Sequence, residues 1–181
     1  MFHYLNYEQK YKRHHPDWEQ RLKKMLDMFL QLQNPDGSFP RKFHDDFTVV
    51  DGSGGSTPSA TLPLVMGYKY FKDKRYLSAA RRTAEYLEKE LISKDDYFSS
   101  TLDANCEDKE ASLYTATATY YLSLITNGTE HNHYASLTRK AAYFALSWYY
   151  VWDVPFAPGQ MLGDICLLYT TPSPRDPKTS R

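Results

Sequence analysis

Two kinds of helical pattern alternate along the chain. In the first kind, apolar residues recur every three or four positions on one face, which is typical of an amphipathic helix at the surface of a core. This pattern covers residues 16–32, 75–92 and 133–152. In the second kind, residues 59–71 and 109–126, apolar side chains occupy nearly every face, and such a helix is buried all round. We therefore predict five helices in two different environments.

The amphipathic helices align at a constant offset of 58 residues, so that Trp18, Tyr76 and Tyr134 correspond. Basic and apolar positions match at the same offset, in the sets Lys23, Arg81 and Arg139; Lys24, Arg82 and Lys140; Leu26, Ala84 and Ala142; Met28, Tyr86 and Phe144. Agreement over three copies indicates a repeated hairpin, and the alternation predicts an inner and an outer layer. The predicted fold class is all-α, an incomplete α/α toroid of helical hairpins with about three outer and two inner helices. A bundle and an open solenoid are the alternatives.

Long joins connect each amphipathic helix to the apolar helix that follows it. The first join is residues 33–58, the second is residues 93–108, and a third begins at Asp153. A solenoid does not normally need loops of this length on one end, so the joins favour the toroid. We expect all three joins at one end of the ring, and functional residues often lie on such loops of a rigid scaffold.

The composition changes after Ile165. Residues 166–181 contain three prolines where a fourth helix should run, and proline does not fit a helix interior. This segment resembles the conceptual translation of a sequencing-library adapter, and we interpret it as an artefactual or disordered tail. The sequence predicts one partial toroid domain, residues 1–165, about half of a ring that lacks C-terminal hairpins of its own chain.

Charge and composition exclude several classes of partner. The 181 residues include 22 basic and 22 acidic side chains, so no basic field indicates nucleic acid or an anionic membrane. No apolar run is long enough to cross a bilayer and no leader is visible at Met1, which leaves the localisation open. Cys106 and Cys166 are too few for a disulfide framework and lack metal-ligand spacing. The sequence indicates no cofactor and no metal.

The first join opens with the motif Gln33-x-x-x-Gly37-x-Phe39. It resembles the glutamine and aromatic motif of triterpene cyclases and protein prenyltransferases, in which it is a structural staple between an outer and an inner helix. Here we expect Gly37 to make the turn, Gln33 to bond backbone groups and Phe39 to pack downwards.

With the hairpin spacing and the two layers, this motif makes residues 16–165 resemble the six-hairpin (α/α)6 glycosidase-like superfamily. The resemblance implies a glycoside hydrolase, an unsaturated-glucuronyl hydrolase or a related polysaccharide lyase. Its substrate would be an oligo- or polysaccharide, and its site would lie at the end of the barrel that carries the outer-to-inner joins.

Glycoside hydrolysis needs two carboxyl groups about 5 to 9.5 Å apart, one as proton donor and one as base or nucleophile. We predict Asp103 or Glu107 as the acid, because the second join is partly apolar, and Asp46 or Asp51 as the base. The alternative for each of them is a solvated or capping role. Asp51 can tie down the glycine-rich turn that follows it, and Asp108 can be the N-cap of the next helix.

Four further residues are candidates for substrate binding. Arg41 and His44 could grip a uronate carboxylate, which would suit a lyase or a glucuronyl hydrolase, although a solvated loop face explains them equally well. Tyr97 and Trp152 could stack on a sugar ring, with core packing as the alternative for Trp152.

The predicted function is a fragment of a carbohydrate-active enzyme, in the first place a glycoside hydrolase with paired carboxylates. A polysaccharide lyase and a non-catalytic helical module that binds glycan or protein are the alternatives. We expect the fragment alone to be inactive and prone to aggregation, because an apolar edge would lie exposed.

Overall fold

The computed structural model describes residues 2–98 and 107–148. Most of these residues are helical, in the elements α1 (Phe2–Tyr11), α2 (Pro16–Leu32), α3 (Thr57–Phe71), α4 (Lys74–Tyr86), the π-helix η1 (Leu87–Ile92), α5 (Lys109–Ile125) and α6 (Gly128–Leu146). Two short antiparallel strands, β1 (Lys42–Phe43) and β2 (Val49–Asp51), lie in the first join. The predicted all-α class is confirmed.

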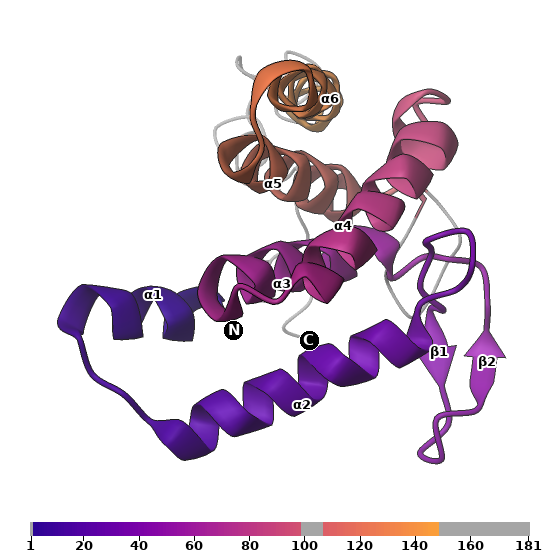
Figure 1. Cartoon of the computed structure of the whole chain (residues 1–181). Helices are drawn as coiled ribbons and strands as arrows, with labels where there is room; N and C mark the ends of the chain where they lie inside the picture. The colour runs from indigo at the N-terminus through magenta and orange to yellow at the C-terminus, as the bar shows by residue number, and fades with distance from the viewer. Residues whose placement is uncertain (1, 99–106, 149–181) are drawn as a thin grey trace, which may run out of the picture.

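The helices pack in two layers (Figure 1). The inner helices α3 and α5 contact each other, while α4 packs on α3 and α6 packs on α5. The remaining amphipathic helix, α2, contacts both α3 and α4. Short turns at residues 72–73 and 126–127 make αα-hairpins of α3 with α4 and of α5 with α6. The predicted alternation of apolar and amphipathic helices therefore corresponds to the observed order of packing.

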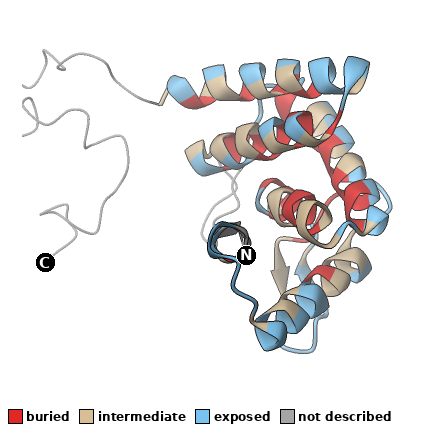
Figure 2. Cartoon of the chain, turned by 60° about the vertical axis from the view of Figure 1, so that its left-hand side comes forward, coloured by how far each residue is buried: buried red, intermediate tan, exposed pale blue. Residues whose placement is uncertain are grey.

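Buried side chains gather where the two layers meet (Figure 2). The core has contributions from every helix from α2 to α6, with the fully buried large side chains Leu26, Leu64, Tyr76, Leu87, Leu91 and Leu122. Gly67 lies at the close approach of α2 to α3, where a Cβ atom would lie 2.6 Å from Leu26 Cδ1 and would force that side chain to shift. The outer helices present their charged faces to solvent, as an amphipathic stripe dictates.

The inner helices differ in how completely they are covered. In α3 only Ser59 is exposed, which confirms the prediction of a helix buried all round. In α5 the same prediction is wrong, because Tyr114, Tyr120 and Leu124 are exposed at helical spacing on one face. The reason is that the described residues place α3 and α6 beside α5, and the face with these three side chains lies away from both.

The offset of 58 residues is visible in how one outer helix packs on the next. Tyr76 of α4 is fully buried and its hydroxyl donates a hydrogen bond to Asp27 Oδ1 of α2 at 2.9 Å. At the same offset, Tyr134 of α6 is buried. Burial raises the pKa of Tyr134, and the negative charge of Glu85 of α4 is among the charges that raise it further. The third equivalent, Trp18 of α2, has no preceding outer helix in the described part of the chain and is 54% exposed.

The helical periodicity did not predict three elements. The helix α1 precedes α2, to which residues 12–15 connect it, and it contacts α3. The last turns of the predicted helix at residues 75–92 are π-helical, since Ser93 N–H donates to Glu88 O at 2.9 Å. The third missed element is the β1–β2 hairpin. In addition, α6 begins at Gly128, five residues before the predicted start at His133.

Among the described helices, none combines the length and apolar character needed to cross a membrane. The predicted tail at residues 166–181, the third join and the end of the third amphipathic helix all lie outside the described residues.

Candidate functional site

The first join begins with a clamp between α2, α3 and α4. The side-chain amide of Gln33 donates to Ala79 O and to Thr83 Oγ1, both at 2.9 Å, and to Gly37 O at 3.2 Å. Gly37 has a φ of +89°, and a Cβ atom there would lie 2.2 Å from Arg82 O. The structural role predicted for the Gln33-x-x-x-Gly37-x-Phe39 motif is confirmed.

The clamp continues into the N-terminus of α3. Phe39 is buried and packs on Phe29, with 5.8 Å between the ring centroids. Its N–H donates to Thr57 Oγ1 at 2.9 Å, and the same hydroxyl donates to Gly54 O at 2.6 Å. The ends of the first join are therefore fixed, and residues 41–51 project between them as the β-hairpin.

The β-hairpin holds four of the predicted site residues. Lys42 pairs with Asp51 and Phe43 pairs with Val49 across the strands. Arg41 lies at the base of the hairpin, where its N–H donates to Asp51 O at 2.7 Å and its Nη1 lies 3.3 Å from Asp51 Oδ2. The Arg41 side chain is only 5% exposed. It is therefore engaged in an ion pair with Asp51, the residue that we predicted as a base.

Asp46 and His44 lie in the turn of the hairpin, where both are exposed. Asp46 Oδ1 accepts hydrogen bonds from the hydroxyl and the N–H of Thr48, at 2.6 and 3.0 Å. These bonds, the hydroxyl first, lower the pKa of Asp46. The backbone of His44 closes the turn with Thr48, by an N–H to carbonyl bond of 2.9 Å.

Asp51 ties down the turn that follows β2. Its Oδ1 accepts from Ser53 N–H at 2.9 Å. Hydrogen bonds from the Ser53 side chain and N–H lower the pKa of Asp51, and the positive charge of Arg41 adds to the effect. Asp51 therefore carries a stable negative charge, and it also has the turn-forming role given above as its alternative.

The second join brings Glu107 back to the start of the same join. Phe98 and Glu107 form an isolated antiparallel bridge, and Asp108 N–H donates to Tyr97 O at 2.8 Å. Glu107 Oε2 accepts from Tyr97 N–H at 3.3 Å. Glu107 is exposed as a residue, but partial loss of hydration at its carboxyl raises its pKa, and the negative charges of Asp96 and Asp95 raise it further.

Tyr97 lies in the core. Its side chain is fully buried and packs on Phe144 in a tilted arrangement, with ring centroids 4.4 Å apart. In this structure the ring faces protein, so it has no face available to a sugar. Asp108 accepts a hydrogen bond from Glu110 N–H at 2.8 Å, which confirms its predicted role as the N-cap of α5. The two other predicted site residues, Asp103 and Trp152, lie outside the described residues.

A surface hollow lies beside each join, and the two hollows are related by the repeat. The first has a volume of about 450 Å³ and is lined by Asp36, Glu85, Tyr86, Lys89 and Glu90. The second has a volume of about 770 Å³ and is lined by Ile92, Ser93, Asp95, Lys140, Tyr143 and Phe144. Glu85 and Tyr86 correspond to Tyr143 and Phe144 at the offset of 58.

The hollows add carboxylates that sequence reasoning missed. In the sequence Glu85 and Glu90 are typical of the solvated side of an amphipathic helix, and only the repeat offset, which relates Glu85 to Tyr143, connects the two hollows. Glu90 forms ion pairs with Lys89 and Lys94, which lower its pKa.

Arg41 and Asp51 therefore form one ion pair in the first join, and Glu107 lies in the second join. Chemically, Glu107 retains a proton to higher pH than a free carboxyl does, while Asp46 and Asp51 stay ionised. No protein-family model matches the chain, and no solved structure is significantly similar to it.

Proposed function

We propose that the chain is part of an α/α toroid of the six-hairpin glycosidase-like kind and that its joins contribute carboxylates to glycoside hydrolysis. In this proposal Glu107 is the general acid, and Asp51 or Asp46 is the base or nucleophile. The substrate is an oligo- or polysaccharide whose scissile bond lies between the two joins.

The placement of Glu107 on one outer-to-inner join and of Asp46 and Asp51 on another carries the proposal, and the opposite directions of their pKa shifts support it. Glu107 has a raised pKa, and Asp46 and Asp51 have lowered pKa values. A protonated and an ionised carboxyl group are what an acid and a base need at the same pH. The packing supports a site made by both joins, because each join runs from an outer to an inner helix of a two-layer array.

A non-catalytic helical-repeat module that binds glycan or protein is the second candidate. It is favoured by the local partners of Asp46 and Asp51, since each accepts hydrogen bonds within its own turn. The ion pair of Arg41 with Asp51 also disfavours the lyase, because that arginine would have to leave its partner to grip a uronate.

The test is to assay single variants of the protein that contains this chain within a complete ring against pools of polysaccharides. Glu107→Gln and Asp51→Asn each remove one proposed group and preserve side-chain volume. We expect each to lower kcat by about 10²- to 10⁴-fold, the usual contribution of a general acid or base. Glu110→Gln is the matched control, because Glu110 is an exposed acid three residues from Glu107 and should keep full activity.

Full turnover by both variants would contradict the carboxylate assignment. Products that absorb as unsaturated uronates would identify a lyase. Binding of glycan without turnover, unchanged in Glu107→Gln, would identify the non-catalytic module.

A further inference from the structure

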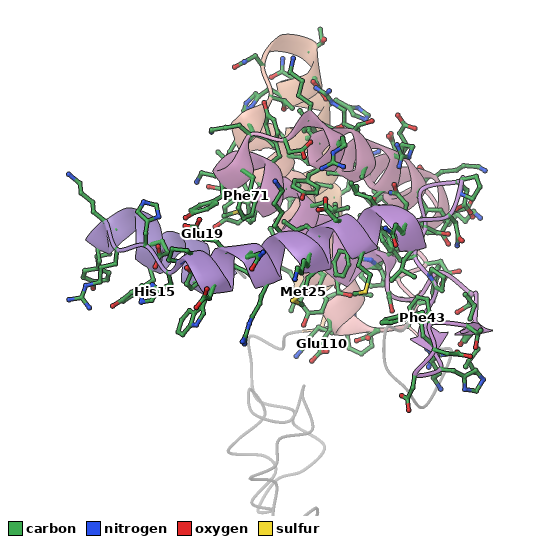
Figure 3. All side chains as sticks on the ribbon, turned by 60° about the horizontal axis from the view of Figure 1, so that its bottom comes forward. His15, Glu19, Met25, Phe43, Phe71 and Glu110 are labelled. Carbon is green, nitrogen blue, oxygen red and sulfur yellow. The ribbon has the colours of Figure 1, made fainter. Side chains whose placement is uncertain are left out.

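A second cluster of chemically active side chains lies at the turn between α1 and α2, at the opposite end of α2 from the first join. Glu8 comes from α1, His14 and His15 come from the turn, and Glu19 comes from the first turns of α2. Figure 3 shows His15 and Glu19 at this end of α2, beside α1. Tyr70 of α3 reaches the same cluster, where its hydroxyl donates to Glu19 Oε1.

Glu8 is the unusual member of the cluster, because it is a carboxylate that is only 3% exposed. Its Oε1 is hydrogen-bonded to His15 Nδ1. Its Oε2 is buried and has no hydrogen-bond partner among the described residues. A buried carboxylate oxygen without a partner is costly, and a bound cation is one of the few ways to compensate for it.

Typical metal ligands lie close to that oxygen. Glu8 Oε2 lies 3.7 Å from His14 Nδ1, and His14 Nδ1 lies 2.9 Å from Glu19 Oε1. One donor atom each from Glu8, His14 and Glu19 can be chosen so that all three lie within 4.8 Å of one another. Bonds of about 2.1 Å at tetrahedral angles separate two ligand atoms by about 3.4 Å. The two distances that involve His14 lie on either side of this value.

We propose that Glu8, His14 and Glu19 bind one divalent transition-metal ion of the zinc class. One imidazole nitrogen with two carboxylate oxygens suits Zn²⁺ better than Mg²⁺ or Ca²⁺, which prefer sites made of oxygen alone. Three protein ligands leave a fourth position for water.

The neighbours of the three ligands have the arrangement expected of an outer shell. His15 holds Glu8 Oε1, so that Oε2 points toward His14, and Tyr70 holds the Glu19 carboxylate from α3. Such hydrogen bonds orient carboxylate ligands and fix their geometry. Because the ligands come from α1, the turn and α2, the ion links α1 to the rest of the fold, and the zinc-bound chain should be the more heat-stable form.

The test is to measure the zinc affinity of the chain by competition with a chromophoric chelator. We expect one high-affinity Zn²⁺ per chain, and a loss of at least about 100-fold in affinity in His14→Ala, since even outer-shell changes cost 10- to 100-fold. The His14 side chain is 75% exposed, so this substitution leaves the core intact. His44→Ala is the matched control, because His44 is an exposed histidine on the β-hairpin.

Glu8→Gln is a second variant that preserves volume and removes the charge. It should weaken zinc binding at unchanged helical circular dichroism and abolish the rise in melting temperature with zinc. Substitution with Co²⁺ should give the visible absorption of a four-coordinate site in the unchanged chain and in His44→Ala, and not in Glu8→Gln or His14→Ala. Equal zinc affinities of the unchanged chain, His14→Ala and His44→Ala would overturn the proposal, as would the absence of binding to the unchanged chain. Neither result bears on the glycosidase proposal, which uses other residues.

Discussion

At the residue scale, the surroundings favour the ionised form of the carboxylates in the first join and the protonated form of Glu107 in the second join. Asp51 accepts hydrogen bonds from Ser53 and lies beside Arg41, so its negative charge is favoured. Glu107 accepts one backbone hydrogen bond, but partial burial and the nearby charges of Asp96 and Asp95 disfavour its ionised form. The free energy of unfolding should report this difference as a dependence on pH.

Glu107→Gln should therefore stabilise the fold at neutral pH and leave stability unchanged in acid. The pKa of Glu107 in the folded chain lies above the reference value of 4.5, so ionisation costs stability as pH rises from about that value through the raised pKa. The glutamine variant avoids this cost and can still accept from Tyr97 N–H. Denaturant unfolding at a series of pH values measures the effect, with Glu110→Gln as control. A variant that is less stable than the unchanged chain at neutral pH would show that Glu107 stabilises the fold as a carboxylate.

At the element scale, the first join acts as a clamp that fixes where α2 ends relative to α4. Gln33 and Gly37 both contact the backbone of α4, one through hydrogen bonds and one through close approach. The sequence motif predicted these roles, because a glycine in a turn and an amide beside free backbone groups have a direct physical meaning.

Gly37→Ala should destabilise the fold by about 2 to 4 kcal/mol, since it combines the cost of a left-handed conformation with a steric clash. The clash is with the Arg82 carbonyl, 2.2 Å from where the new Cβ atom would lie. Gly128→Ala is the matched control, because Gly128 also has a positive φ but no atom within 4 Å of an added Cβ. It should cost only about 1 kcal/mol. Denaturant unfolding compares the two variants, and equal losses would contradict the clamp.

Other elements were predictable only where a periodic pattern or a capping residue marks them. Pro16 and Asp108 mark the starts of α2 and α5, and both were placed correctly. By contrast, α6 starts in the polar segment before Tyr134, where no apolar stripe exists. The β-hairpin has strands of two and three residues, which is too short for an alternating pattern to appear.

The candidate sites were less predictable than the helices. Nothing in the local sequence shows that Glu8 is buried, because its burial depends on the packing of α1 on α3. The placement of Tyr97 in the core similarly depends on Phe144, a residue from another hairpin. Tertiary contacts of this kind are not encoded in the spacing of neighbouring residues.

At the scale of the whole molecule, the described chain is a two-layer array with apolar side chains exposed at both ends. Trp18 is exposed at one end, although its equivalents Tyr76 and Tyr134 are buried. At the other end, Tyr120 of α5 and Tyr143 of α6 are exposed, and Tyr143 has 67% of its surface accessible. An array that continued at both ends would cover these side chains, which is what a toroid requires.

We propose that these apolar ends pack on further helices, and sedimentation velocity of the isolated chain tests this proposal most directly. We expect the sedimentation coefficient to rise with concentration as chains associate through the exposed ends. Replacing the exposed Trp18 and Tyr143 together with glutamine should reduce that rise, because it removes the largest apolar groups from both ends. A chain that sediments as a monomer at every concentration, with or without the substitutions, would contradict the claim.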